Sequence, residues 1–313
     1  MSRIFLKKVE TRKHRSNFQL SKYQLPTVVE TRVPRLPSTL VGKMCIVFIY
    51  SGYHDPESCY SLVLAANRDE FFDRQAQNMA PWKEDQTIFG GIDLEAECQS
   101  TWLAYSFSEK KIGLLLNYPE IKKESPKSRG KIVTDYIKSK YTTDNYVPFI
   151  RDNGDDYNGF IFVTVELRNK EPLIQTYTNA THNLQTWKQK CVGFSNSLPD
   201  TPLSKVVAGR ERMQKNCEEY KAIEDKSKLI ESLLDFLKSK ERHLPDPILQ
   251  NRRPMDYKCF SSIFVCLPSA RYGTRTHTLM LVTKSGHVDL IEVTMQSPIN
   301  LSSPNWKRSN FQL

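Results

Sequence analysis

Long apolar segments are missing from this sequence of 313 residues. No run approaches the roughly 18–20 residues that a helix needs to cross a bilayer. The first residues, MSRIFLKKVE, also lack the apolar stretch of about 7–15 residues that a secretory signal requires. We therefore expect a cytoplasmic chain with no transmembrane segment.

Paired metal ligands are also scarce. The seven cysteines form no CxxC pair, and the two closest, Cys259 and Cys266, are not spaced as zinc ligands. The six histidines include no pair at metal-binding spacing. The pattern predicts free thiols in a reducing compartment and no metal site.

A broad basic surface is not expected either, although the formal net charge is +10. Residues 1–43 hold ten Lys and Arg residues against two acidic ones, so they carry most of the excess. Residues 44–313 hold 35 basic and 33 acidic side chains. A nearly neutral body lacks the electrostatic footprint of a nucleic-acid-binding protein, so no nucleic-acid partner is predicted.

Residues 1–43 show neither a helical nor a strand period, and three prolines interrupt them. We expect a disordered arm here, followed by one domain over residues 44–313. The segment KHRSNFQL at 13–20 nearly repeats WKRSNFQL at 306–313. One explanation, which we favour, is that a neighbouring duplicate gene was joined to this one by readthrough or by a faulty gene model. The other is an Arg-rich targeting peptide, similar to a mitochondrial presequence.

From residue 44 onward, expected strands and expected helices follow one another. Apolar, β-branched runs predict strands over 45–50, 61–66, 111–118, 159–167, 172–177, 261–267, 277–283 and 287–295. Apolar residues at helical spacing predict helices over 130–141, 203–220 and 228–239. Lys284-Ser285-Gly286 predicts a hairpin turn between the last two strands. This order of elements indicates an α+β domain with antiparallel sheet.

Cys45 follows a methionine, Met44, and opens the first expected strand. If Met44 were the initiator and were removed, Cys45 would carry a free α-amine beside its thiol. That amine, with a pKa near 7.7–8.0, could accept the proton of the thiol and make it a nucleophile. A peptide bond before Cys45 removes this base. On chemistry alone, a buried strand cysteine is favoured.

The stretch Asn67-Arg68-Asp69-Glu70 comes at the end of the second expected strand. Arg68 could stabilise a thiolate or hold an anionic substrate, because a guanidinium pairs well with carboxylate or phosphate. Asp69 could orient Arg68. As an isolated pattern, a surface cluster of ion pairs after a strand is the favoured explanation of these residues.

The combination of motifs is more specific than either motif alone. A Met-Cys opening followed by ANRDEF resembles the Transport and Golgi organization 2 family, also called the NRDE family. The resemblance continues through GGIDLE (90–95), TWLA (101–104), LLNYP (115–119), SRGKIV (128–133), YNGF (157–160), GFSNSLPDTP (193–202), LPDP (244–247) and YGTRTHTLMLV (272–282). Because family members begin at the Met before the cysteine, the resemblance implies that Met44 is the functional start.

The NRDE family is similar to the N-terminal-nucleophile hydrolases, above all to the choloylglycine and penicillin V acylase branch. This similarity implies a four-layer αββα sandwich. It also implies that Cys45 is the nucleophile and that Asn117 donates to the oxyanion. The full set of site residues carried over by position is Cys45, Arg68, Asp69, Asn117, Asn196 and Arg275.

One departure from the acylase pattern affects Asp69. In the acylases an aspartate stands three residues after the arginine, whereas here Asp69 follows Arg68 directly. Adjacent side chains of a strand point to opposite faces. Arg68 and Asp69 are therefore not both expected to face Cys45, which weakens the catalytic assignment of Asp69.

The resemblance leaves two main functions open, and a structural or scaffolding role in secretion is a third possibility to which no sequence feature is specific. The favoured one is a haem-trafficking or chaperone factor that mobilises haem from storage or mitochondrial sites, with links to lipid homeostasis and Golgi organisation. Haem would then be a cargo, no cofactor would be required, and a mitochondrial or Golgi association is possible. His54 is the expected iron ligand by position, although a solvated loop histidine is the simpler interpretation. The alternative is a cysteine hydrolase or acyltransferase for amide or thioester substrates.

Overall fold

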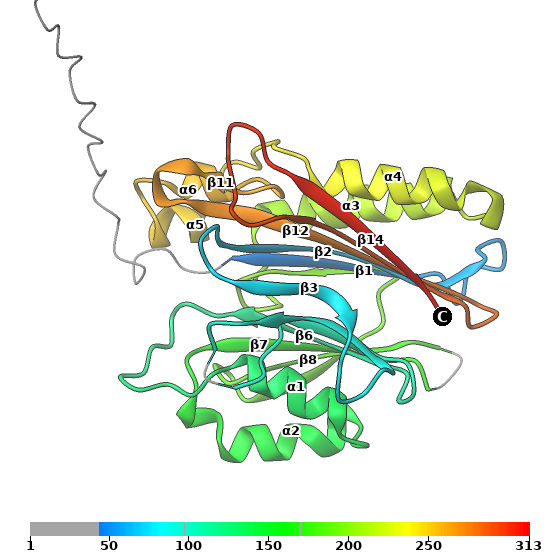
Figure 1. The fold of residues 1–313 in the computed structure, drawn as a ribbon, viewed down its shortest axis with the longest axis horizontal. Helices are drawn as coiled ribbons and strands as arrows, with labels where there is room; N and C mark the ends of the chain where they lie inside the picture. The colour runs from blue at the N-terminus through cyan, green and yellow to red at the C-terminus, as the bar shows by residue number, and fades with distance from the viewer. Residues whose placement is uncertain (1–43, 97, 169–170) are drawn as a thin grey trace, which may run out of the picture. The chain divides into compact units, whose positions relative to one another are not determined.

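The computed structural model describes residues 44–96, 98–168 and 171–313 (Figure 1). The predicted arm over residues 1–43 lies outside the described residues. The described part contains two seven-stranded antiparallel sheets together with helices, which confirms the α+β class. All seven cysteines lie in it and are free thiols, as predicted.

The first sheet has the strand order β10-β1-β2-β12-β13-β14, with β11 paired to β12. Its strands are β1 (Cys45–Ser51), β2 (Tyr60–Phe71), β10 (Cys191–Phe194), β11 (Cys266–Leu267), β12 (Tyr272–Thr283), β13 (Val288–Met295) and β14 (Trp306–Gln312). The predicted hairpin joins β12 to β13. Gly286 occupies its turn with φ +96°, a conformation that glycine adopts without strain.

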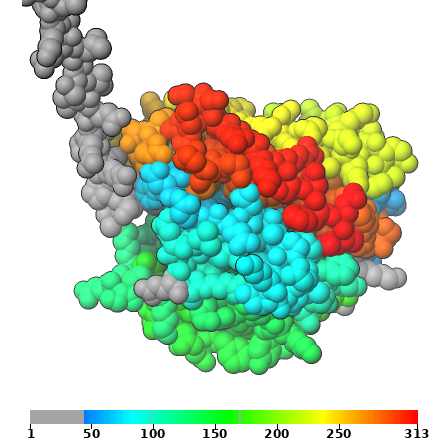
Figure 2. Space-filling model, in the orientation of Figure 1, coloured from blue at the N-terminus to red at the C-terminus, as the bar shows by residue number. Residues whose placement is uncertain are grey.

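The second sheet has the strand order β3-β4-β5-β6-β7-β8-β9. Its strands are β3 (Ala76–Pro81), β4 (Ile88–Asp93), β5 (Leu103–Ser106), β6 (Lys111–Asn117), β7 (Phe160–Glu166), β8 (Leu173–Thr178) and β9 (Asn183–Trp187). Figure 2 shows part of the two sheets from outside, with residues near 70–110 in cyan between the red C-terminal strand and the green residues.

Helices cover the outer faces of the sheets (Figure 1). The helices are α1 (Gly130–Lys138), α2 (Thr143–Asp152), α3 (Ser204–Glu219), α4 (Lys226–Leu237), α5 (Pro247–Arg252) and α6 (Tyr257–Phe260). One apolar cluster packs α3 and α4 on the first sheet, a second fills the space between the sheets, and a third packs α1 and α2 on the second sheet. Among the described residues, no helix combines the length and apolar character needed to span a bilayer.

One strand prediction was wrong in part. The run 261–267 forms a strand only at Cys266–Leu267. The backbone before it turns instead, because the amide of Phe264 donates to the carbonyl of Ser239 and the amide of Val265 donates to the hydroxyl of Thr274. These bonds replace the sheet ladder that the apolar residues predict.

Candidate functional site

The first strand and the second strand place a thiol beside a guanidinium. The antiparallel register pairs Cys45 with Arg68. Both side chains lie on the face toward the second sheet, because Val47 of β1 and Ala66 of β2 belong to the core between the sheets. Strand alternation and the register of β1 with β2 therefore place the side chains of Cys45 and Arg68 side by side.

The Asp69 carboxylate lies on the opposite face of β2, as the departure from the acylase pattern predicts. Its Oδ1 accepts a hydrogen bond of 2.6 Å from the Thr274 hydroxyl of β12. Only the backbone carbonyl of Asp69 approaches the site, with its oxygen 4.0 Å from the Sγ of Cys45. Asp69 therefore belongs to the layer between the first sheet and the helices.

Asn196, just after β10, joins the two sheets at this point. Its Oδ1 accepts from the backbone N–H of Cys45 at 2.7 Å, and its Nδ2 donates to the carbonyl of Asn117 at 2.5 Å. The neighbouring Ser195 hydroxyl donates to the carbonyl of Cys45 at 2.7 Å. Asn196 is fully buried, so it fixes the position of Cys45 relative to the end of β6.

A cavity of about 280 Å³ opens between the sheet ends at this junction, and Cys45, Arg68 and Asn117 line it. Arg275 is not among its lining residues. The Arg275 guanidinium donates instead to the carbonyls of Phe71 and Arg74, so it supports the backbone that follows β2. The structure thus brings four of the six predicted residues to one junction and places the Asp69 carboxylate and Arg275 beside it.

The cavity is rich in fixed charge. Its lining includes a group of cations and a smaller group of acidic residues: Arg68, Arg74, Lys127 and Arg129, with Glu70 and Asp93. The Trp102 ring holds Arg68 in place, with the guanidinium carbon 3.9 Å from the ring centroid. No role was predicted for Trp102 or Arg129, although the motifs TWLA and SRGKIV contain them.

The Cys45 thiol is protonated at neutral pH. Burial raises the pKa of Cys45 to about 12, and the negative charge of Asp69 adds to this shift. The Asp69 carboxyl has a pKa raised to about 7, chiefly by burial and against the attraction of Lys205. A thiolate would therefore need a base placed directly beside the sulfur.

Lys205 of α3 is a buried cation that sequence reasoning missed. Its side chain is fully buried, and its Nζ donates to the carbonyl of Ser262 at 3.1 Å. Burial lowers the pKa of Lys205, while the nearby charge of Asp69 opposes that effect. No local signal marks this lysine, because a lysine in an amphipathic helix normally reaches solvent.

The residue before Cys45 is also held inside the fold. Met44 is only 4% exposed, and its N–H donates to the hydroxyl oxygen of Tyr272 at 2.5 Å. The same hydroxyl lies 3.4 Å from the Met44 carbonyl oxygen, to which it donates. While Met44 is present, the nitrogen of Cys45 is a peptide nitrogen and cannot act as a base.

His54, which was weighed as an iron ligand against the favoured interpretation of a solvated loop histidine, lies elsewhere. Its side chain is 73% exposed and pairs with Glu171, and it lines a separate cavity that shares no residue with the one at Cys45. No cluster of three or more His, Cys, Asp or Glu side chains in the described ranges is arranged to hold a metal ion.

The fold and the site together define a class: an α+β protein whose two antiparallel sheets meet at a thiol-centred, cationic pocket. A family model described as Transport and Golgi organisation 2 matches residues 44–297. The chain belongs to this family.

The alignments with named relatives cover most of this chain and most of each relative. Transport and Golgi organization protein 2 of Drosophila melanogaster is 32% identical over 262 residues, which is 80% of this chain and 92% of the relative. The Mus musculus homolog is 30% identical over 282 residues, or 86% and 98% of the two chains. The Homo sapiens homolog is 33% identical over 266 residues, or 80% and 93%.

Proposed function

We propose that the Cys45 pocket is an N-terminal-nucleophile site that cleaves or transfers the acyl group of a small amide or thioester. The observation that carries the proposal is the convergence of the Cys45 thiol, Arg68, Asn117 and Asn196 at one sheet junction. The two helix-covered antiparallel sheets support the further proposal that the fold is an αββα sandwich of the same hydrolase type.

The reaction requires that Cys45 be the first residue. Its neutral α-amine then takes the proton of the thiol, and the sulfur attacks the acyl carbon, forming a C–S bond. The Asn117 amide, at the cavity wall, donates to the developing oxyanion, which is worth about 3–4 kcal/mol in comparable sites. The C–N or C–S bond of the substrate breaks as the leaving group takes the proton from the ammonium.

Arg68 and the other cavity cations determine the substrate class in this proposal. An acyl donor that carries a carboxylate or phosphate would place this anion against the guanidinium groups. The acyl-enzyme thioester is then resolved by water in hydrolysis, or by an amine or thiol acceptor in transfer. The size of the cavity favours a small substrate or one end of a larger one.

The test compares protein that begins at Cys45 with the full chain, using a panel of anionic p-nitroanilide and thioester substrates. We expect turnover and a covalent acyl-enzyme, detected by intact mass, only in the Cys45-start protein. Cys45→Ala in the same form is the matched control and should abolish both signals. Equal turnover with and without the thiol would overturn the proposal.

A second candidate function is haem handling, and the same cavity supports it. A thiol at its wall could ligate iron, while the surrounding arginines could pair with the two propionates. In this proposal the protein mobilises haem from storage or mitochondrial sites and is linked to lipid homeostasis.

Haem titration of the full chain, followed by Soret absorbance, tests this second function. We expect one saturable equivalent whose Soret band shifts in Cys45→Ala and whose affinity falls in Arg68→Met. Lys83→Asn, at an exposed position away from the cavity, is the control. The absence of saturable binding would rule out this function.

A further inference from the structure

A second, larger cavity lies at the opposite end of the sandwich. Its volume is about 480 Å³, and none of its lining residues lines the Cys45 cavity. Ser61 near the start of β2 lines it, whereas Arg68 toward the end of β2 faces the thiol. Since Ser61 and Arg68 stand seven positions apart on the extended strand β2, the two sites are separated by roughly 20 Å.

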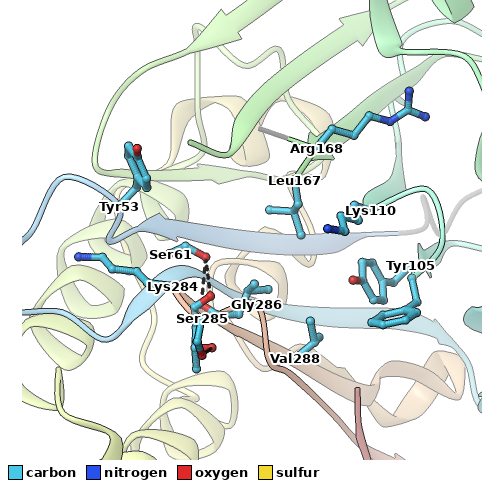
Figure 3. A pocket seen from close by; sticks show the side chains of 13 residues that line it. Tyr53, Ser61, Tyr105, Lys110, Leu167, Arg168, Lys284, Ser285, Gly286 and Val288 are labelled. Carbon is cyan, nitrogen blue, oxygen red and sulfur yellow. Dashed lines mark hydrogen bonds between the residues drawn. The ribbon is translucent and has the colours of Figure 1, made fainter. Parts of the chain in front are cut away.

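Part of the wall of this cavity is apolar and is formed by residues of both sheets and the loops beside them. Val282 and Val288 contribute from the first sheet, Tyr105 from the second, and Leu167 from the position just after β7. Figure 3 labels Tyr105, Leu167 and Val288. All four belong to the core between the sheets or pack against it. An apolar group that entered the cavity would therefore contact the ordered interior of the protein and not a mobile surface.

The rim of the cavity is positively charged. Lys110, Arg168 and Lys284 line it, and no Asp or Glu is among its lining residues. The Arg168 guanidinium is neutralised by Glu109 at 2.6 Å. The Nζ of Lys284 donates to the backbone carbonyl of Asp55. Within the described part of the chain, neither Lys110 nor Lys284 forms an ion pair with a carboxylate, so two positive charges remain uncompensated.

We propose that this cavity binds an amphiphilic anion, a molecule with an apolar body and one acidic head group. The body would lie on the valine, leucine and tyrosine walls, and the head group would lie at the rim beside Lys110. Figure 3 shows Lys110 next to Leu167 and across the cavity from Ser285 and Val288. The volume is in the range of small-molecule sites. This binding does not depend on Cys45.

Calorimetry of the full chain with three probes tests the proposal. Decanoate, which has the tail and the anionic head, should bind saturably at one equivalent. Decyltrimethylammonium, which has the same tail and a cationic head, and acetate, which has the head alone, should bind at least tenfold more weakly on the scale of Kd. Equal binding of the two decyl probes would overturn the assignment of an anion site.

Two variants locate the bound decanoate. Lys110 has φ 49°, a conformation that asparagine accepts, so Lys110→Asn removes the charge without straining the turn. It should weaken decanoate binding about three- to fivefold. Ser285→Trp, at an exposed position on the rim, should fill the cavity and remove binding. Lys83→Asn is the matched charge control and should change nothing.

Cys45→Ala separates this proposal from the function proposed for the thiol site. Decanoate binding should be unchanged in that variant, because the two cavities share no residue. Loss of binding in Cys45→Ala, with retention in Ser285→Trp, would place decanoate in the thiol cavity and overturn the inference.

Discussion

At the scale of single residues, Asn196 has the clearest structural role. Replacement by alanine leaves the N–H of Cys45 and the carbonyl of Asn117 without their partner inside the protein. Each lost bond and each unpaired buried group costs about 1–3 kcal/mol. We expect Asn196→Ala to lower the free energy of unfolding by about 2–4 kcal/mol in urea denaturation. Asn251→Ala, at an exposed site, should change it by less than about 0.5 kcal/mol.

Asp69 gives a prediction about pH. Burial raises the pKa of Asp69 to about 7, well above the unfolded value near 3.9. The folded protein therefore binds more protons than the unfolded chain between these values, and stability falls as the pH rises from about 4 to 7. Glu292, also raised to about 7 by burial, adds to the same slope.

Asp69→Asn keeps an acceptor for Thr274 and removes one titrating group. We expect the loss of stability between pH 4 and 7 to become smaller in this variant, by an amount of the order of a few kcal/mol at most. Urea unfolding at several pH values measures it, with the exposed Asp200→Asn as control. An unchanged slope would show that Asp69 does not titrate in this range.

The site residues that the sequence predicted differ from those that it did not in whether a contiguous motif contains them. Cys45, Arg68, Asn117 and Asn196 stand in contiguous motifs at strand ends, where the resemblance assigns roles by position. Lys205 and its neighbours carry no such signal. Their importance comes from burial under β2, which depends on contacts far apart in the chain.

At the scale of elements, hydrophobic periodicity predicted the helices and strands with long apolar stretches. It failed where the sequence is polar or where side-chain hydrogen bonds determine the backbone conformation. The helices α1, α3 and α4 begin and end within a few residues of their predicted bounds. The helix α2 was not predicted, and Pro148 inside it weakens the helical pattern. The edge strand β14 was missed because its sequence, WKRSNFQ, is mostly polar and exposed.

Asn67 shows how one side chain can fix the conformation of the segment 261–267, most of which is not a strand. Its Nδ2 donates to the carbonyls of Leu237 at 2.8 Å and Ile263 at 3.0 Å, and its Oδ1 pairs with the ring of His277 at 2.6 Å. The first residue of the NRDE motif therefore ties β2 to the end of α4 and to the chain before β11.

We expect Asn67→Ala to destabilise this connection selectively. Amide hydrogen exchange over 261–267 should become at least about tenfold faster, since the lost bonds to two buried carbonyls exceed 1.4 kcal/mol. Exchange in β7, which belongs to the other sheet, should change only as much as global stability does. Equal acceleration in both places would show that Asn67 stabilises the whole domain and not this segment.

At the scale of the whole molecule, one residue, Met44, affects both the stability of the fold and the chemistry of Cys45. Met44 packs in the core between the first sheet and the helices, and Tyr272 holds its peptide group. Met44 also forms a peptide bond with Cys45, so the free α-amine that the proposed reaction needs does not exist while Met44 is present. Activity and maximal stability are therefore expected in different forms of the chain.

Three forms of the protein separate these effects: the chain beginning at Met44, the same chain with Met44→Ala, and the chain beginning at Cys45. Loss of the buried methionine side chain should lower the free energy of unfolding by about 2–4 kcal/mol in both altered forms. Only the form that begins at Cys45 gains a base beside the thiol. Its alkylation by iodoacetamide should therefore accelerate as the pH rises through about 8, where the α-amine loses its proton. If Met44→Ala alkylates as fast as the Cys45-start form, cavity formation and not the free amine controls the thiol.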